Sequence, residues 1–136
     1  MIYITRRERF SAAHRMFRED WSDQENQKVF GKCSNPNWHG HDYVLYVTIR
    51  GDISEETGYF MNINTLKEII KEKIIDKVDH KNLNIEVGFM LGRIATSENL
   101  AVAIWNELKP AIEREGAVLH CIRIGETENN TIEYYG

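Results

Sequence analysis

The chain has 136 residues, of which 42% are hydrophobic and 28% are charged. This length suits one domain with one core, and the composition is that of a folded globular protein rather than a disordered chain. A formal net charge of −4 argues against general nucleic-acid binding. No apolar run approaches the roughly 20 residues that span a membrane. The charged N-terminus does not resemble a signal peptide, and two cysteines do not make a disulfide framework, so we expect a cytoplasmic protein with free thiols.

The first elements expected along the chain are two strands separated by a long polar segment. Residues 3–13 alternate loosely between apolar and polar side chains, and residues 41–51 contain a run rich in β-branched and aromatic residues. Both patterns predict strands. Residues 15–38 are polar and are interrupted by Asn, Asp, Gly and Pro, so we expect a loop. A loop of this length inside a compact domain is usually functional.

Two amphipathic helices are expected in the middle of the chain. Asn62 or Asn64 can cap the first helix, which should end near Lys77 or Val78. Its buried face is marked by apolar residues at helical spacing: Leu66, Ile69, Ile70 and Ile74. After a second loop, Thr96 can cap the second helix. A proline at position 110 should kink or end that helix, because proline lacks the backbone N–H that the helix needs.

The C-terminal part of the chain is expected to form a β-hairpin. Residues 118–127 and 131–135 read as strands joined through Asn129-Asn130, and asparagine tolerates the positive φ that a tight hairpin turn requires. The resulting order, ββααββ, predicts an α+β fold with a four-stranded antiparallel sheet and two helices on one face. We expect a single domain over residues 1–136.

Three histidines form a candidate metal site. His39 and His41 enter the second strand two residues apart, so both should point to the same face, and His14 ends the preceding strand-like run. Three histidines without a fourth protein ligand are typical of a catalytic zinc, although a His-x-His pair alone is a weak signal and unrelated histidines are the alternative. Cys33 is either a fourth ligand or a free thiol beside the metal, and its five-residue gap to His39 favours the free thiol.

Several acidic residues have both a structural and a functional interpretation. Asp79-His80 follows the first helix and is either a helix end with a favourably placed histidine or an acid–base pair in which the carboxylate orients the imidazole. Glu98 is either a first-turn charge or part of a site. Glu126 follows an apolar run, where a carboxylate can bind a cationic or N–H-rich ring.

With these residues identified, the chain resembles the 6-pyruvoyl-tetrahydropterin synthase family nearly from end to end. The resemblance is carried by five segments in a specific order and spacing: Phe10-Ser11-Ala12-Ala13-His14-Arg15, Gly31-Lys32-Cys33 through His39-Gly40-His41, Asp79-His80-Lys81-Asn82-Leu83, Thr96-Ser97-Glu98-Asn99 and Glu126-Thr127-Glu128-Asn129-Asn130. It implies the tunnelling fold, in which three subunits join their sheets into a barrel and two trimers stack as a homohexamer.

The resemblance also implies which residues carry the chemistry. The zinc ligands of the family, one ion per subunit, fall on the three histidines already named, and its catalytic cysteine falls on Cys33. Its catalytic Asp–His pair falls on Asp79 and His80, which reach the site from a neighbouring subunit. Its pterin-anchoring glutamate falls on Glu126, and the segment that lines its pterin pocket falls on Thr96-Ser97-Glu98.

The activity implied is a lyase reaction that converts 7,8-dihydroneopterin triphosphate to 6-pyruvoyl-tetrahydropterin and triphosphate, with Mg²⁺ as an optional companion of the triphosphate. The alternatives are the related 6-carboxy-5,6,7,8-tetrahydropterin synthase of queuosine biosynthesis, a sepiapterin-cleaving relative, and a non-catalytic oligomer that binds zinc and pterins. The five-residue gap after Cys33 resembles the pyruvoyl branch. Six basic residues are unranked candidates for holding the triphosphate: Arg6, Arg9, Arg15, Lys32, Lys81 and Arg93.

Overall fold

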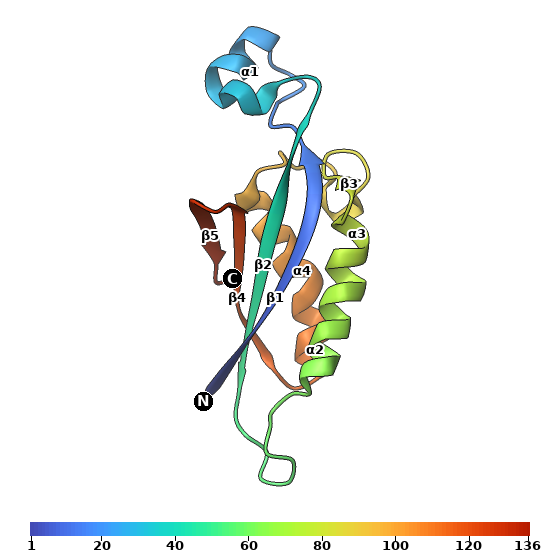
Figure 1. The fold of residues 1–136 in the computed structure, drawn as a ribbon, viewed down its shortest axis with the longest axis vertical. Helices are drawn as coiled ribbons and strands as arrows, with labels where there is room; N and C mark the ends of the chain where they lie inside the picture. The colour runs from blue at the N-terminus through green and yellow to red at the C-terminus, as the bar shows by residue number, and fades with distance from the viewer.

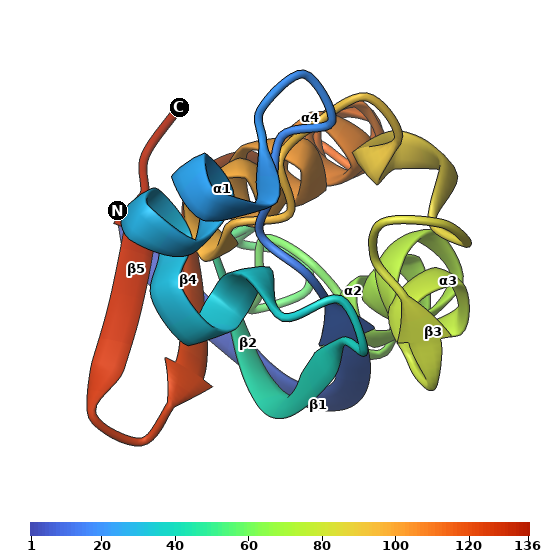
Figure 2. The same cartoon turned by 90° about the horizontal axis from the view of Figure 1, so that it is seen from above.

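The structure is a computed structural model that describes residues 1–136, and it contains one sheet with helices packed on one face (Figures 1 and 2). The strands are β1 (Ile2–His14), β2 (His39–Gly51), β3 (Lys81–Asn82), β4 (Val118–Thr127) and β5 (Asn130–Tyr134). They lie in the order β3-β1-β2-β4-β5. The expected α+β fold is confirmed. The two-residue β3, which pairs in parallel with β1, adds a fifth strand to the four antiparallel strands expected.

The first helical segment lies behind the sheet and joins three pieces: α2 (Ile63–Ile70), a π-helical turn η2 (Lys71–Ile75) and α3 (Asp76–Val78). Asn62 caps it, because its side chain accepts a 2.8 Å hydrogen bond from the backbone N–H of Asn64. Four fully buried side chains recur at every fourth position: Leu66, Ile70, Ile74 and Val78. In a regular α-helix such a row drifts by about 40° per step. The wider π turn offsets that drift and keeps the row against the sheet.

Helix α4 (Ser97–Arg114) packs beside it on the same face. Pro110 is expected to kink or end this helix, and the second of these outcomes is wrong, because α4 continues for another turn. Pro110 lies on the exposed side, and so does Asn106, whose carbonyl loses its helical partner and can bond to water instead. Leu108 and Ile112 continue the buried face past the proline, so packing holds the helix together.

The long segment between β1 and β2 is not entirely loop. It contains helix α1 (Asp23–Phe30), which lies beyond the end of the sheet (Figure 1). Ser22 caps α1 by accepting a 3.1 Å hydrogen bond from the backbone N–H of Glu25. Asn26 is buried and exchanges two hydrogen bonds with the backbone of Arg18, at 2.8 and 2.9 Å. These contacts give the polar segment a fixed shape.

The β4–β5 hairpin also differs from expectation. Its turn consists of Glu128 and Asn129, between the paired residues Thr127 and Asn130, and neither asparagine has a positive φ. The pairing shifts register between Gly125 and Thr127. Such a bulge supplies the extra twist that positive φ values would otherwise provide.

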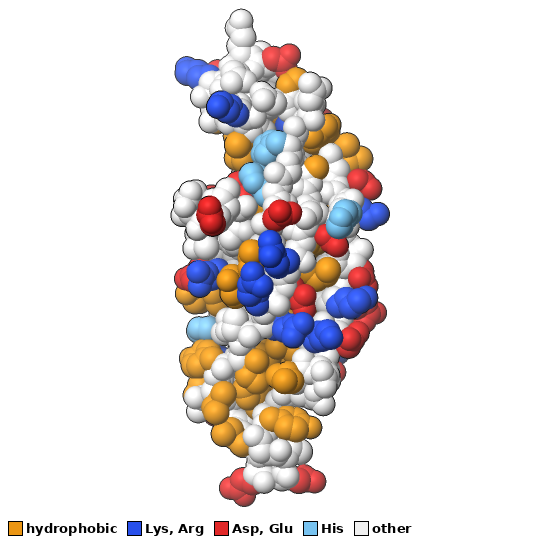
Figure 3. Space-filling model, in the orientation of Figure 1, with side chains coloured by type: hydrophobic (Ala, Val, Ile, Leu, Met, Phe, Trp, Pro, Cys, Tyr) orange, Lys and Arg blue, Asp and Glu red, His pale blue; other side chains and the backbone are white.

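The core fills the space between the helices and the sheet and contains 26 buried residues. Strand β2 contributes every second side chain: Tyr43, Leu45, Val47 and Ile49. The same alternation places His39 and His41 on this face, at the end of the strand beyond the core. The other face of the sheet is open, and Lys and Arg side chains gather over its middle (Figure 3). None of the helices combines the length and hydropathy needed to cross a bilayer.

Candidate metal centre and substrate pocket

The structure brings the three predicted histidines together. His14, the last residue of β1, pairs directly with His39, the first residue of β2, and His41 lies two positions further along the same face. One ring nitrogen of each histidine lies within 4.8 Å of the others. Strand pairing between the two longest strands therefore creates the cluster, without help from a flexible loop.

The ring nitrogens of this cluster fit a bound cation. His14 is fully buried, and its Nδ1 donates a 2.7 Å hydrogen bond to the carbonyl of Ala95, which leaves Nε2 as an acceptor. His14 Nε2, His39 Nδ1 and His41 Nε2 are buried without any hydrogen-bond partner. Unpaired buried polar atoms are costly and need an explanation, and one metal ion would satisfy all three.

Burial favours the neutral form of two of these imidazoles, those of His14 and His39. It lowers the pKa of His14, against the opposing effect of the Ala95 hydrogen bond, and it also lowers the pKa of His39, with His41 adding to the effect. Neutral imidazole is the form that ligates a metal, and nitrogen donors suit zinc among the common ions. The group could therefore hold a metal ion with a position left for substrate or water.

A carboxylate from β4 lies at one side of the histidines. Glu126 places one carboxylate oxygen 3.5 Å from His41 Nε2, and its other oxygen accepts a short hydrogen bond from the hydroxyl of Ser97. Thr96 caps α4 by accepting a 3.1 Å hydrogen bond from a backbone N–H of the first turn. These residues form one polar wall, whereas Glu98 is exposed in the first turn of α4.

Cys33 lies in the 3-10 turn η1 (Gly31–Ser34) and is a free, partly exposed thiol. Its carbonyl accepts a 2.8 Å hydrogen bond from the backbone of Met16, which ties the turn to the chain just beyond His14. The charges of Glu126 and Cys33 add to burial in raising the pKa of Tyr43, whose ring centroid lies 6.2 Å from that of His14. The sulfur is not a member of the histidine group.

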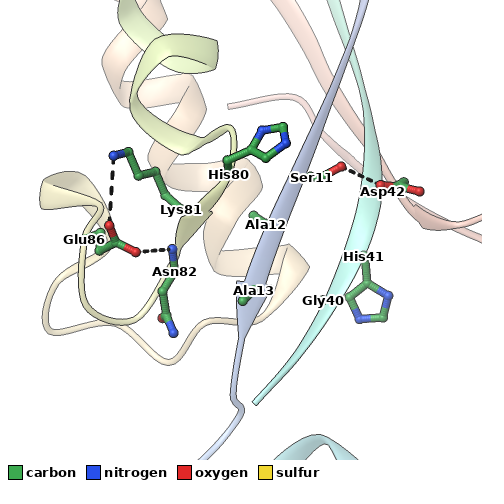
Figure 4. A pocket seen from close by; sticks show the side chains of 10 residues that line it. All are labelled: Ser11, Ala12, Ala13, Gly40, His41, Asp42, His80, Lys81, Asn82 and Glu86. Atoms are coloured by element: carbon green, nitrogen blue, oxygen red, sulfur yellow. Dashed lines mark hydrogen bonds and ion pairs between the residues drawn. The ribbon is translucent and has the colours of Figure 1, made fainter. Parts of the chain in front are cut away.

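Asp79 and His80 form a contact pair outside the histidine group of their own chain. His80 Nδ1 lies 3.0 Å from an Asp79 oxygen, which also accepts a 3.0 Å hydrogen bond from the backbone of Ser11. That N–H is the main cause of the lowered pKa of Asp79, with His80 contributing. The side chain of His80 is 83% exposed. It lies on the β3 side of β1, whereas His41 projects from the far side of β2 (Figure 4).

Two groups that hold His14 and the residue after it in place could not be identified from the sequence. The Ala95 carbonyl orients His14, and every residue type has such a carbonyl. Asn84 exchanges hydrogen bonds of 2.9 and 2.8 Å with the backbone N–H and carbonyl of Arg15, which fixes the chain directly after His14. Polar loop composition alone does not distinguish Asn84 from its neighbours.

The α+β sheet carries, at one end, three convergent histidines that could hold a metal ion and a carboxylate beside them. The family model described as 6-pyruvoyl tetrahydropterin synthase matches residues 3–136. The chain belongs to this family.

Individual relatives agree along the whole chain. A 6-pyruvoyl tetrahydrobiopterin synthase from Dictyostelium discoideum is 47% identical over 135 residues, which cover 99% of this chain and 96% of the relative. The solved structure of Caenorhabditis elegans 6-pyruvoyl tetrahydropterin synthase is 38% identical, with a TM-score of 0.92 and coverage of 99% of this chain and 95% of that one. A 6-carboxy-5,6,7,8-tetrahydropterin synthase from Rickettsia bellii is 28% identical over 149 residues, covering 98% and 99%.

Proposed function

We propose that the protein is a zinc-dependent lyase that converts 7,8-dihydroneopterin triphosphate to 6-pyruvoyl-tetrahydropterin and triphosphate. The observation that carries this proposal is the set of three buried, partnerless imidazole nitrogens beside Glu126. The greater identity to the pyruvoyl-forming relative than to the carboxy-forming one, 47% against 28%, supports the pyruvoyl product.

The cofactor in this proposal is one zinc ion per subunit, held by His14, His39 and His41. When bound, zinc supplies Lewis acidity toward the side-chain hydroxyls of the substrate and the C–H bonds next to them. Mg²⁺ would accompany the triphosphate in solution. A cytoplasmic location suits this chemistry, because Cys33 must remain a free thiol and the cytoplasm is reducing.

Three residues of the chain handle the substrate ring and its protons. Glu126 accepts hydrogen bonds from the ring N–H groups, a charge-assisted contact that fixes the ring beside the histidines. Cys33 as thiolate removes the carbon-bound proton from the side chain, and His80, oriented by Asp79, relays a proton at the second side-chain carbon. The side chain is oxidised as the ring is reduced, so the reaction needs no external reductant.

The position of His80 supports an oligomeric enzyme. The imidazole is exposed and is not part of the histidine group of its own chain, although it lines the same hollow as His41, so it would be free to serve the site of a neighbouring subunit. The sheet has edges at β3 and β5, and joining such edges between three subunits would close a barrel and remove unpaired backbone groups. We therefore propose a homohexamer built from two trimers.

Product identification tests the proposed function. The zinc-loaded protein is incubated with 7,8-dihydroneopterin triphosphate, and triphosphate release and product mass are followed together. We expect equimolar triphosphate and 6-pyruvoyl-tetrahydropterin. A 6-carboxytetrahydropterin product would assign the enzyme to queuosine biosynthesis instead, and turnover of sepiapterin alone would indicate a side-chain-cleaving relative. Binding of zinc and pterin without release of triphosphate would identify a non-catalytic oligomer.

A further inference from the structure

A second hollow is lined by residues adjacent in sequence to the histidine group. It has a volume of about 940 Å³, against about 460 Å³ for the hollow in front of His80. Its walls are partly apolar, from Phe17, Trp38 and Leu91, and its polar lining includes two arginines. We call it the Trp38 groove.

Two residues that line the Trp38 groove are sequence neighbours of residues that form or support the histidine group. Trp38 immediately precedes His39, and Ile94, which also lines the groove, immediately precedes the Ala95 carbonyl that holds His14. The order of the strands indicates the direction in which a bound substrate would extend. Glu126 lies on β4, the histidines lie on β2 and β1, and the segment after β3 lines the groove. A substrate whose ring is at Glu126 and whose side chain crosses the histidines therefore directs its far end toward this groove.

The charges of the groove favour an anion. Arg18 is already paired with Asp20, at 2.6 Å. Arg93 has no carboxylate partner, and its backbone N–H donates a 3.0 Å hydrogen bond to Met90, which fixes the turn that presents it. Arg15 adds a second positive charge without a carboxylate partner, held 4.0 Å above the ring of Phe17. Among the lining residues, Glu19 is the opposing unpaired charge and balances Arg93. Arg15 is not itself a lining residue, but it lies against the lining residue Phe17, so counting it makes the local sum of the unpaired charges positive.

Trp38 forms the wall next to the metal ligands and is held in a strained conformation. Its φ is +66°, in the left-handed region that non-glycine residues seldom adopt, and its backbone N–H donates a 3.2 Å hydrogen bond to Asn35. Strain of this kind is concentrated at ligand-binding sites, where the surrounding structure maintains it. A large ring placed there narrows the groove beside His39.

We propose that the Trp38 groove binds the triphosphate end of the substrate, with the guanidinium of Arg93 as a phosphate ligand and Trp38 as a wall. The proposal rests on the proposed function, because it assumes a pterin that carries a triphosphate. Arginine suits this role, since its planar fork of N–H donors matches two phosphate oxygens at once. Phosphate affinity therefore resides at the opposite end of the pocket from Glu126.

The test measures binding of inorganic triphosphate by calorimetry to the zinc-loaded wild-type protein and to Arg93→Ala. We expect the dissociation constant to rise about tenfold or more, as for the loss of a hydrogen bond between charged groups, while Arg93→Lys retains part of the affinity. The matched control is Arg114→Ala, which removes the same charge at the other end of α4 and should bind as wild type. The affinity of phosphate-free 7,8-dihydroneopterin should not change in Arg93→Ala.

Trp38→Gly provides a second variant, because glycine adopts the same backbone conformation without strain. It should raise the KM for the triphosphate substrate while leaving phosphate-free pterin binding unchanged. Wild-type affinity for triphosphate in Arg93→Ala would overturn the proposal. So would equal weakening of both ligands, or loss of triphosphate binding in Arg123→Ala, whose guanidinium lies over Tyr46 on the open sheet face. Absence of triphosphate release by the wild-type protein would refute the proposed function separately, because calorimetry needs no turnover.

Discussion

The imidazole of His14 and the backbone carbonyl of Ala95 are joined by a buried hydrogen bond of 2.7 Å that connects β1 to the segment before α4. The bond orients the imidazole and sets its tautomer. The same segment continues into Thr96 and Ser97, which form the wall beside Glu126. The candidate metal site and the polar wall beside Glu126 are thus connected through one contact.

Replacing a histidine of the cluster should remove the metal. In His39→Ala, one of the three nitrogen donors is lost, and we expect zinc content measured by elemental analysis to fall to near zero together with activity. The control is His120→Ala, because His120 lies outside the cluster. In the wild-type protein, a chelator should lower the melting temperature, since a ligand at 100 times its Kd stabilises the folded state by about 2.7 kcal/mol. Full zinc content in His39→Ala would contradict the assignment.

Zinc retention should extend to lower pH than for ordinary imidazole ligands. Burial lowers the pKa values of His14 and His39 below 6.5, so protons compete with the metal only at lower pH. Without metal, the folded state takes up fewer protons than the unfolded state as the pH falls from 6.5 to the lowered values, so stability is lost across that window. Zinc release to a coloured chelator and denaturant unfolding, both against pH, measure the two effects. A zinc-release midpoint above pH 6.5 would count against this account.

Cys33→Ala should separate catalysis from metal binding. Because the sulfur lies outside the histidine group, we expect wild-type zinc content and a fall in kcat of about 10²- to 10⁴-fold, the usual contribution of a positioned base. Elemental analysis and a triphosphate-release assay on the same preparation provide the two measurements. If the metal is lost along with activity, the thiol is a ligand and the assignment is wrong.

Mixed oligomers should test whether His80 serves a neighbouring subunit. Cys33→Ala and His80→Ala are each expected to be nearly inactive alone. After the two chains are refolded together in equal amounts, about one quarter of the sites would combine an intact Cys33 with an intact His80 from the next subunit. Activity should therefore return to about that fraction. No recovery in mixed hexamers, shown to be mixed by mass spectrometry, would mean that both residues act within one chain.

Pro110→Ala should stabilise the protein without affecting activity. Proline inside a helix costs about 3 kcal/mol relative to alanine, and the greater freedom of the unfolded alanine chain offsets about 1 kcal/mol. We expect a net gain of about 2 kcal/mol in the free energy of unfolding, measured with denaturant. Lys109→Ala, at a neighbouring exposed position with one surface ion pair, should change stability by less than about 1 kcal/mol.

The parts of the fold and site that follow from periodicity could be predicted from the sequence. His39 and His41 share a face because strand side chains alternate, and Asn62 and Thr96 begin helices because their side chains accept backbone hydrogen bonds. Helix α1 has no apolar stripe and escaped detection, although Ser22 and Glu25 match a capping-box pattern.

Other features depend on tertiary context that local sequence does not contain. The continuation of α4 beyond Pro110 depends on packing on its buried side. The left-handed backbone of Trp38 contradicts the preference of that residue type, so no propensity would indicate it. The prediction of a hairpin turn with positive φ at the asparagines is wrong, because a bulge in β4 supplies the twist that the hairpin requires.

The alternation that runs along β2 from the core to His39 and His41 makes the candidate metal centre sensitive to insertions and deletions. Adding or removing a single residue between Tyr43 and His41 would reverse both imidazoles to the open face of the sheet, while the hydrophobic interior stayed intact. Variation in this protein family should therefore tolerate length changes in the segment before Trp38 and exclude them in the strand that follows.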